Sequence, residues 1–279
     1  MKKWKIFSQD KIAVLSLFFL IVITTISIFA PAFTTYSYDQ QNIEQRLETP
    51  TMNHLMGTDS LGRDLYSRIV YGARMSLAVG LVTALFALTF GTITGCIAGY
   101  AGGRTDQFIM RVADIFYIFP YLLLAILFTL LFGRGLLGIF LALGASTWVL
   151  QARLVRGLVL QAKEMSYVES AHSIGASHYK VIIKHILPNL MGPIIVSLTF
   201  QIPTNIMAES FLSFIGLGLQ PPYSSWGTLA NEGFRAMRSY PHLILFPGTI
   251  LFITLLAFNY LGDGLRDLLD PKRKENIDN

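Results

Sequence analysis

The stretch Met75-Ser-Leu-Ala-Val-Gly-Leu-Val-Thr-Ala-Leu-Phe-Ala-Leu-Thr-Phe-Gly-Thr-Ile-Thr-Gly-Cys-Ile-Ala-Gly-Tyr-Ala-Gly-Gly103 contains no Asp, Glu, Lys or Arg. A helix of about 20 apolar residues is long enough to cross the hydrocarbon core of a bilayer. Because lipid cannot satisfy exposed backbone groups, such a stretch must be helical. It therefore predicts a membrane-spanning helix.

Five further charge-free stretches flank it, over residues 12–38, 115–133, 135–152, 186–208 and 239–262. Only 14% of the residues are charged and the mean hydropathy is +0.52, whereas soluble domains carry roughly 25% charged residues. We therefore predict an all-α polytopic membrane protein with six transmembrane helices, near residues 12–33, 75–101, 111–132, 136–152, 186–208 and 242–261.

The basic residues predict an orientation. With both termini in the cytoplasm, most of the 22 Lys and Arg residues fall inside, clustered within 2–11, 153–184 and 266–274. Cytoplasmic loops are enriched in these residues, so the net charge of +5 reflects topology and gives little support to nucleic-acid binding. Cleavage as a signal peptide is the alternative for the first stretch, but signal sequences have apolar regions of only ~7–15 residues and Ile12–Phe29 is longer.

We expect three parts along the chain. Residues 1–74 form a cytoplasmic tail, the first transmembrane helix and an external loop. Residues 75–265 form a core of five transmembrane helices with a cytoplasmic loop at 153–185, and residues 266–279 form a second cytoplasmic tail. Within the external loop, helical spacing of apolar residues over 64–74 predicts an amphipathic helix on the outer membrane surface.

Glycines recur at intervals of four along the second predicted helix. Small residues at this spacing let another helix approach closely, either within the chain or on a partner subunit. The predicted packing stripe consists of Gly91, Gly95, Gly99 and Gly103.

The cytoplasmic segment before the fifth helix reads Tyr167-Val-Glu-Ser-Ala-His-Ser-Ile-Gly-Ala-Ser-His-Tyr-Lys-Val-Ile-Ile-Lys-His-Ile-Leu-Pro-Asn189. We predict a short helix over 165–173 that presents Val168 and Ala171 on one side. Gly175 suits a helix end, where a positive φ is often needed. The next helix starts at Pro188, whose missing N–H costs nothing in a first turn. This arrangement predicts a docking lever on the cytoplasmic face.

The same segment resembles the EAA motif of ABC importer permeases. In that family the motif forms a coupling helix that docks on the ATP-binding subunit. Small residues at Ser170 and Ala171 would permit close contact there, although Ser170 replaces the usual Ala and His185 stands where Ile is frequent. The resemblance implies coupling roles for Glu169, Ser170, Ala171, Gly175, Leu187 and Pro188.

Three more segments resemble the peptide-transporter branch of this family, most closely its C-type permease of dipeptide, oligopeptide and nickel importers. They are Gly57-Thr-Asp-Ser-Leu-Gly-Arg-Asp64, Glu209 to Gly227 and Asn259 to Pro271. The resemblance implies the type I (MetI-like) permease fold in a bacterial inner membrane. It also implies membrane lipid, a second homologous permease, two ATP-binding subunits and an extracellular solute-binding protein as partners.

The implied substrate is a di- or oligopeptide, with nickel or a metal–metallophore complex as the alternative. ATP and Mg would be bound by the partner subunits, and this chain would bind no cofactor. The chain contains no GxxxxGK[ST] loop, HExxH or GxSxG motif, so we expect a non-catalytic transport subunit. The single cysteine, Cys96, and the widely spaced His172, His178 and His185 predict no metal site.

Polar residues near the ends of the last two helices are candidates for the pathway or its gate, because ionisable groups there are often functional. They are Asn205, Glu209, Asn259 and Asp263. Nearby water at the membrane interface is the plainer explanation for Glu209 and Asp263. For Arg63 and Asp64 we expect a surface helix start with a local ion pair. An ion-coupled secondary transporter is the rival of a different class, but it needs buried charges, which the six stretches lack.

Overall fold

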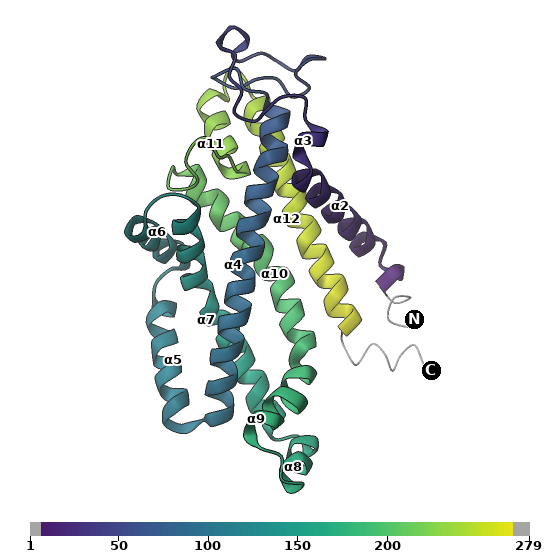
Figure 1. The fold of residues 1–279 in the computed structure, drawn as a ribbon, viewed down its shortest axis with the longest axis vertical. Coiled ribbons are helices and arrows are strands. Elements are labelled where there is room, and N and C mark those ends of the chain that lie inside the picture. Colours follow the sequence, from purple (N-terminus) through teal and green to yellow (C-terminus); the bar gives the residue numbers. More distant parts are fainter. Residues whose placement is uncertain (1–6, 270–279) are drawn as a thin grey trace.

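The structure, a computed structural model, describes residues 7–269 as a bundle of helices with no β-strand in that range (Figure 1). Five helical segments are long and apolar enough to span a membrane, and a bent pair supplies a sixth candidate. The predicted all-α fold with multiple spans is therefore confirmed. The spans are α2 (Lys11–Ile28), α4 (Leu65–Ala101), the pair α5 (Gly103–Ile118) and α6 (Tyr121–Phe132), α7 (Leu136–Lys163), α10 (Leu187–Phe214) and α12 (His242–Leu269).

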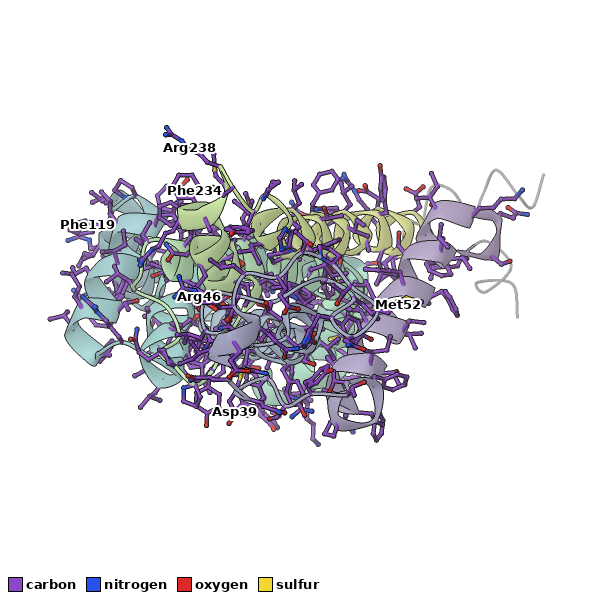
Figure 2. All side chains as sticks on the ribbon, turned by 90° about the horizontal axis from the view of Figure 1, so that it is seen from above. Asp39, Arg46, Met52, Phe119, Phe234 and Arg238 are labelled. Atoms are coloured by element: carbon purple, nitrogen blue, oxygen red, sulfur yellow. The ribbon has the colours of Figure 1, made fainter. Side chains whose placement is uncertain are left out.

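Helix α4 is central to the bundle and packs against α7, α10 and α2, while α12 packs against both α10 and α2. At one end of the molecule lie α8 (Ser166–Ser173) and α9 (His178–Val181). At the other lie the 34–64 segment and α11 (Trp226–Ala236) (Figure 1). Figure 2 views the molecule from this second end. In that view, Phe119 of the bent pair lies on the side opposite α2.

Three glycines of the predicted stripe bring α4 against α7. A Cβ added at Gly95 would lie 2.5 Å from the Ala152 carbonyl oxygen, and Gly91 and Gly99 are similarly close to α7. Gly103 does not join them, because Gly102 ends α4 with a φ of 64° and nothing lies within 4 Å of a Cβ at Gly103. The packing prediction is wrong for Gly103 within this chain.

The predicted third span, 111–132, is wrong as a single helix. Helices α5 and α6 meet at an angle of 92° across Phe119 and Pro120. A proline disfavours the helical conformation at the residue before it, and Phe119 is extended, with φ −78° and ψ 136°. Proline also has no N–H with which to continue the helical hydrogen bonds.

Several helices extend beyond their predicted ends. The helix predicted over 64–74 does not lie on the membrane surface but forms the first part of α4. Its Leu65, Ile69 and Ala73 are buried in a core cluster with Trp226. Helix α7 continues to Lys163 inside the expected 153–185 loop, and α10 continues past residue 208 to Phe214.

The tail expected over 266–279 begins inside α12, which continues to Leu269. The rest of that tail, Pro271 of the resemblance motif, and residues 1–6 of the amino-terminal tail lie outside the described residues.

A buried ion network surrounds the amino-terminal end of α4. Asp59 accepts from Arg63 Nε at 2.6 Å and from Arg68 Nη1 at 2.5 Å, and Arg68 also binds Glu232 of α11. Asp64 caps α4 by accepting from Ser67 N at 2.7 Å. The expected surface ion pair at Arg63 and Asp64 is wrong, because Arg63 pairs with Asp59 and all these groups except Glu232 are buried.

Candidate translocation cavity and coupling surface

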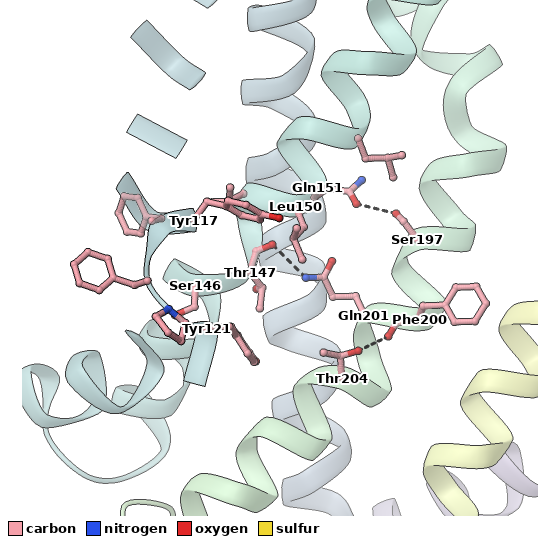
Figure 3. A pocket seen from close by; sticks show the side chains of 15 residues that line it. Tyr117, Tyr121, Ser146, Thr147, Leu150, Gln151, Ser197, Phe200, Gln201 and Thr204 are labelled. Carbon is pink, nitrogen blue, oxygen red and sulfur yellow. Dashed lines mark hydrogen bonds between the residues drawn. The ribbon is translucent and has the colours of Figure 1, made fainter. Parts of the chain in front are cut away.

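A cavity of about 590 Å³ lies beside the middle of α7 and α10 (Figure 3). Its wall comes from residues 146–154 of α7, residues 197–204 of α10 and the α5–α6 break at residues 116–121. None of the 15 lining side chains is charged. Aromatic rings and uncharged polar groups therefore share the surface.

The break between α5 and α6 brings polar backbone groups to this cavity. Helix ends leave backbone carbonyls and N–H groups without helical partners. Inside a membrane, such groups are tolerated only where they are buried in protein or line a water-filled cavity. Phe119, Pro120 and Tyr121, which form the break, all line this cavity.

The polar side chains that line the cavity include two glutamines, one on α7 and one on α10 (Figure 3). Gln151 Oε1 accepts from Ser197 Oγ at 2.8 Å, while its Nε2 is buried without a hydrogen-bond partner. Gln201 Nε2 donates to the backbone oxygen of Thr147 at a long 3.3 Å. An unpaired buried donor costs about 1–3 kcal/mol, so Gln151 has an unmet hydrogen-bonding capacity at the cavity.

Neither glutamine was among the predicted site residues. The signal that could have found them is their isolation within charge-free membrane stretches, where a buried amide side chain needs a partner. Asn205 lies one helical turn from Gln201 and is fully buried, with its Nδ2 donating to Thr83 Oγ1 at 2.8 Å. It joins α10 to α4 and is not among the lining residues.

Glu209 was expected at a helix end near water. This prediction is wrong, because α10 extends beyond Glu209 to Phe214. The side chain is fully buried, and Ser213 Oγ donates to it at 2.6 Å. Ser76 of α4 and Ser210 lie at 3.4 and 3.5 Å. The carboxyl group thus sits in a hydroxyl-lined site that joins α10 to α4.

The two candidates on α12 are placed differently. Asn259 is exposed and donates to the Leu255 carbonyl of its own helix at 2.8 Å, and Asp263 is also exposed. Neither lines the cavity. The structure therefore does not bring the four predicted pathway residues together.

The short helix predicted over 165–173 is confirmed as α8. Val168 and Ala171 are buried in a cluster with Val155 and Ile186, so Ala171 anchors α8 and is not free to contact another surface. Glu169 and Ser170 are exposed. This end also exposes large apolar side chains, among them Met165, Ile174 and Tyr179.

The turn after α8 has the expected geometry. Gly175 has a φ of 80°, the left-handed region that favours glycine, and nothing lies within 4 Å of a Cβ built there. A π-helical segment, Ile182–Ile186, leads directly into α10, whose first turn contains Leu187 and Pro188. The chain is therefore helical from α9 through the whole of α10.

Two histidines of the segment meet at Tyr100, near the carboxyl end of α4. The Tyr100 hydroxyl lies 2.8 Å from His178 Nδ1 and 3.3 Å from His172 Nε2, and Lys163 Nζ donates to the Tyr100 carbonyl at 3.0 Å. These contacts fix α8 and α9 to α4 and α7. Their spacing of six in the sequence gave no indication of this contact, which depends on the turn at Gly175.

A family profile described as the binding-protein-dependent transport system inner membrane component matches residues 91–275, most of the chain, from within α4 through α12. The chain belongs to this family. A second profile, the N-terminal transmembrane domain of oligopeptide transport permease C, matches residues 2–50 of the permease.

Known relatives cover nearly the whole permease. The oligopeptide transport system permease protein OppC of Bacillus subtilis is 42% identical over 269 residues, which is 96% of this chain and 88% of the relative. The dipeptide transport system permease protein DppC of the same organism is 44% identical over 270 residues, covering 96% and 84%. The glutathione transport system permease protein GsiD of Pectobacterium atrosepticum is 40% identical over 272 residues, covering 97% and 90%.

Among solved structures, an inward-facing form of the MetNI methionine ABC transporter matches with a TM-score of 0.57 and 17% identity. The match covers 72% of this chain and 95% of that one. At this identity it supports the fold alone. The permease is therefore a multi-pass inner-membrane transport subunit with a MetI-like fold.

Proposed function

We propose that this permease pairs with a second, homologous permease to form the pathway of an ABC importer for di- and oligopeptides. The observation that carries the proposal is the uncharged cavity at the middle of α7 and α10, whose mostly apolar wall carries a few polar side chains. Peptides present mostly neutral amide groups, and a pathway needs contacts weak enough to release its cargo. The oligopeptide, dipeptide and glutathione relatives support the same substrate class.

Nickel or a metal–metallophore complex stays the second candidate. A bare nickel ion favours imidazole and other donor side chains. The cavity is lined by no His, Cys, Asp or Glu, and the described residues contain no cluster of three such side chains suited to a metal ion. These observations favour peptides. The ion-coupled rival has no support from the family to which the chain belongs.

In this proposal the partner subunits supply the energy for transport. Two ATP-binding subunits would bind ATP and Mg and dock on α8, while an extracellular solute-binding protein delivers the cargo to the opposite end. Exposed Glu169 and Ser170, with the apolar side chains around them, support α8 as the docking surface. Since α10 is continuous with this segment and forms part of the cavity wall, a movement of α8 would be transmitted to the pathway through α10.

The orientation is part of the proposal. Both termini and α8 would face the cytoplasm, and the 34–64 segment with α11 would face outward. The excess of Lys and Arg on the α8 side supports this arrangement.

Affinity purification of the tagged chain from its native membrane in mild detergent tests the proposal. We expect an ATPase with a Walker A loop and a second six-helix permease to co-purify. The purified complex, reconstituted in liposomes with its binding protein, should take up trialanine only when ATP is supplied. A chain that purifies folded but without an ATPase would contradict the importer assignment.

A further inference from the structure

We propose that Gln151 and Gln201 recognise the backbone amide of the cargo peptide, a role that rests on the proposed peptide-importer function. Both side chains lie at the cavity, both have incomplete hydrogen bonding, and no charged side chain lines the cavity around them.

Each glutamine has one half of its amide group engaged and the other half free. Gln151 is held through Oε1 by Ser197, which leaves a buried Nε2 donor with no partner. Gln201 is held through Nε2 by Thr147, and its Oε1 accepts no hydrogen bond from the described residues. Gln201, with its free acceptor, thus lies on the cavity wall, while the free Gln151 donor from α7 is buried behind that wall (Figure 3).

A peptide bond offers the complementary pair. Its carbonyl oxygen accepts and its N–H donates, so Gln151 Nε2 would donate to the carbonyl and Gln201 Oε1 would accept from the N–H. The engaged halves tie both side chains to neighbouring helices, and the Gln151 amide would have to turn toward the cavity for its donor to meet the cargo.

The lining also limits what the site can select. With no charged side chain among the 15 that line the cavity, the charged termini and side chains of a peptide find no ion-pair partner there. Every peptide carries the same backbone amide. The site would therefore accept peptides of varied sequence and discriminate against cargo whose backbone lacks the N–H.

The test compares Gln151→Met and Gln201→Met with Gln161→Met, an exposed glutamine on the same helix α7 and outside the cavity. The complete transporter, with its binding protein, is reconstituted in liposomes, and ATP-dependent uptake of trialanine is measured. We expect each cavity variant to lower uptake about three- to tenfold, the effect of one lost hydrogen bond, and Gln161→Met to leave it unchanged. Cavity variants that match Gln161→Met would overturn the inference, whereas absent uptake by the wild-type complex would overturn the peptide-importer function itself.

A second cargo separates recognition from a structural role. In trialanine with both peptide nitrogens methylated, Gln201 has no N–H to accept. Uptake of this analogue should therefore be slow in the wild type and no slower in Gln201→Met, while Gln151→Met lowers it further. Equal proportional losses for the two cargos in Gln201→Met would show that Gln201 acts only on the structure.

A measurement on the unaltered glutamines covers the case in which the variants fail to assemble. Ser146 lines the cavity, so Ser146→Cys, in a chain with Cys96→Ala, provides a labelling site for a maleimide. Trialanine should slow this labelling, and the N-methylated analogue should slow it several-fold less. Equal protection by the two peptides would overturn amide recognition.

Discussion

Asp106 of α5 accepts two parallel hydrogen bonds from Arg156 of α7, from Nε at 2.5 Å and from Nη2 at 2.6 Å. This forked ion pair joins the first turn of α5 to α7, the long helix that forms one wall of the cavity. Arg153 and Asp114 form a second contact between the same two helices, and the Arg153 guanidinium lies 4.0 Å from the Tyr117 ring centroid.

We expect Asp106→Asn to loosen α5 from α7. The pair is partly exposed, so the free energy of unfolding should fall by only about 1 kcal/mol. The measurement is the thermal unfolding midpoint in detergent at low and high salt. Asp263→Asn removes an exposed carboxylate on α12 and serves as the control, with an unchanged midpoint. Equal midpoints for the two variants would contradict a stabilising role for the pair.

Gly95→Ala should destabilise the α4–α7 contact, because the added Cβ would lie 2.5 Å from the Ala152 carbonyl oxygen. Overpacking of this kind typically costs about 1–3 kcal/mol. Gly157→Ala in α7 is the matched control, since nothing lies within 4 Å of a Cβ there. Unfolding midpoints should fall for Gly95→Ala and stay level or rise for Gly157→Ala. The reverse order would show that the two helices do not pack in this register.

Asp59→Asn should strongly destabilise the packing at the amino-terminal end of α4. It removes the negative partner of Arg63 and Arg68, which are 7% and 2% exposed, and breaking a buried pair typically costs about 3–5 kcal/mol. Glu232→Gln should cost less, because the Glu232 side chain is 38% exposed. Proteolysis of the 34–64 segment in intact spheroplasts would report the loss. Greater sensitivity in Glu232→Gln than in Asp59→Asn would contradict the network described above.

Gly175→Val should impair uptake while leaving the chain inserted. A φ of 80° is strained for a side chain with a β-branch, by about 1–2 kcal/mol, although no atom obstructs the space around it. Gly175→Asn is the control, because asparagine tolerates the left-handed region. We expect uptake to fall for Gly175→Val and to be largely retained for Gly175→Asn. Equal uptake by both would mean that the turn does not position α8.

Glu169→Lys tests the docking surface itself. Glu169 is exposed on α8, so charge reversal should leave the fold intact and prevent co-purification of the ATP-binding subunits. The measurement is the yield of ATPase recovered with the tagged chain. The exposed Glu164→Lys, at the end of α7, is the matched reversal that should affect this yield less. If both variants recovered equal yields of ATPase, Glu169 would have no specific role in docking.

The segment between α7 and α10 shows how far local patterns predict structure. Gly175 stands where the sequence predicts a turn. Pro188 lies in the first turn of α10, but the helix start predicted there is wrong, because the preceding π-helical segment continues into α10 without a break. By contrast, the sequence alone did not show that Ala171 faces the chain's own core, because that depends on how α8 folds back against α7 and α10.

The long charge-free stretches determined the class of this protein by themselves, because the bilayer leaves a spanning segment no alternative to internal backbone hydrogen bonding. The tertiary structure decided the rest. Whether Glu209 meets water, whether Gly103 packs, and which polar side chains line a cavity depend on where neighbouring helices end and on the bend at Pro120. Contacts between residues as distant as Gln151 and Ser197 arise only when the helices assemble, so no local pattern in the chain encodes them.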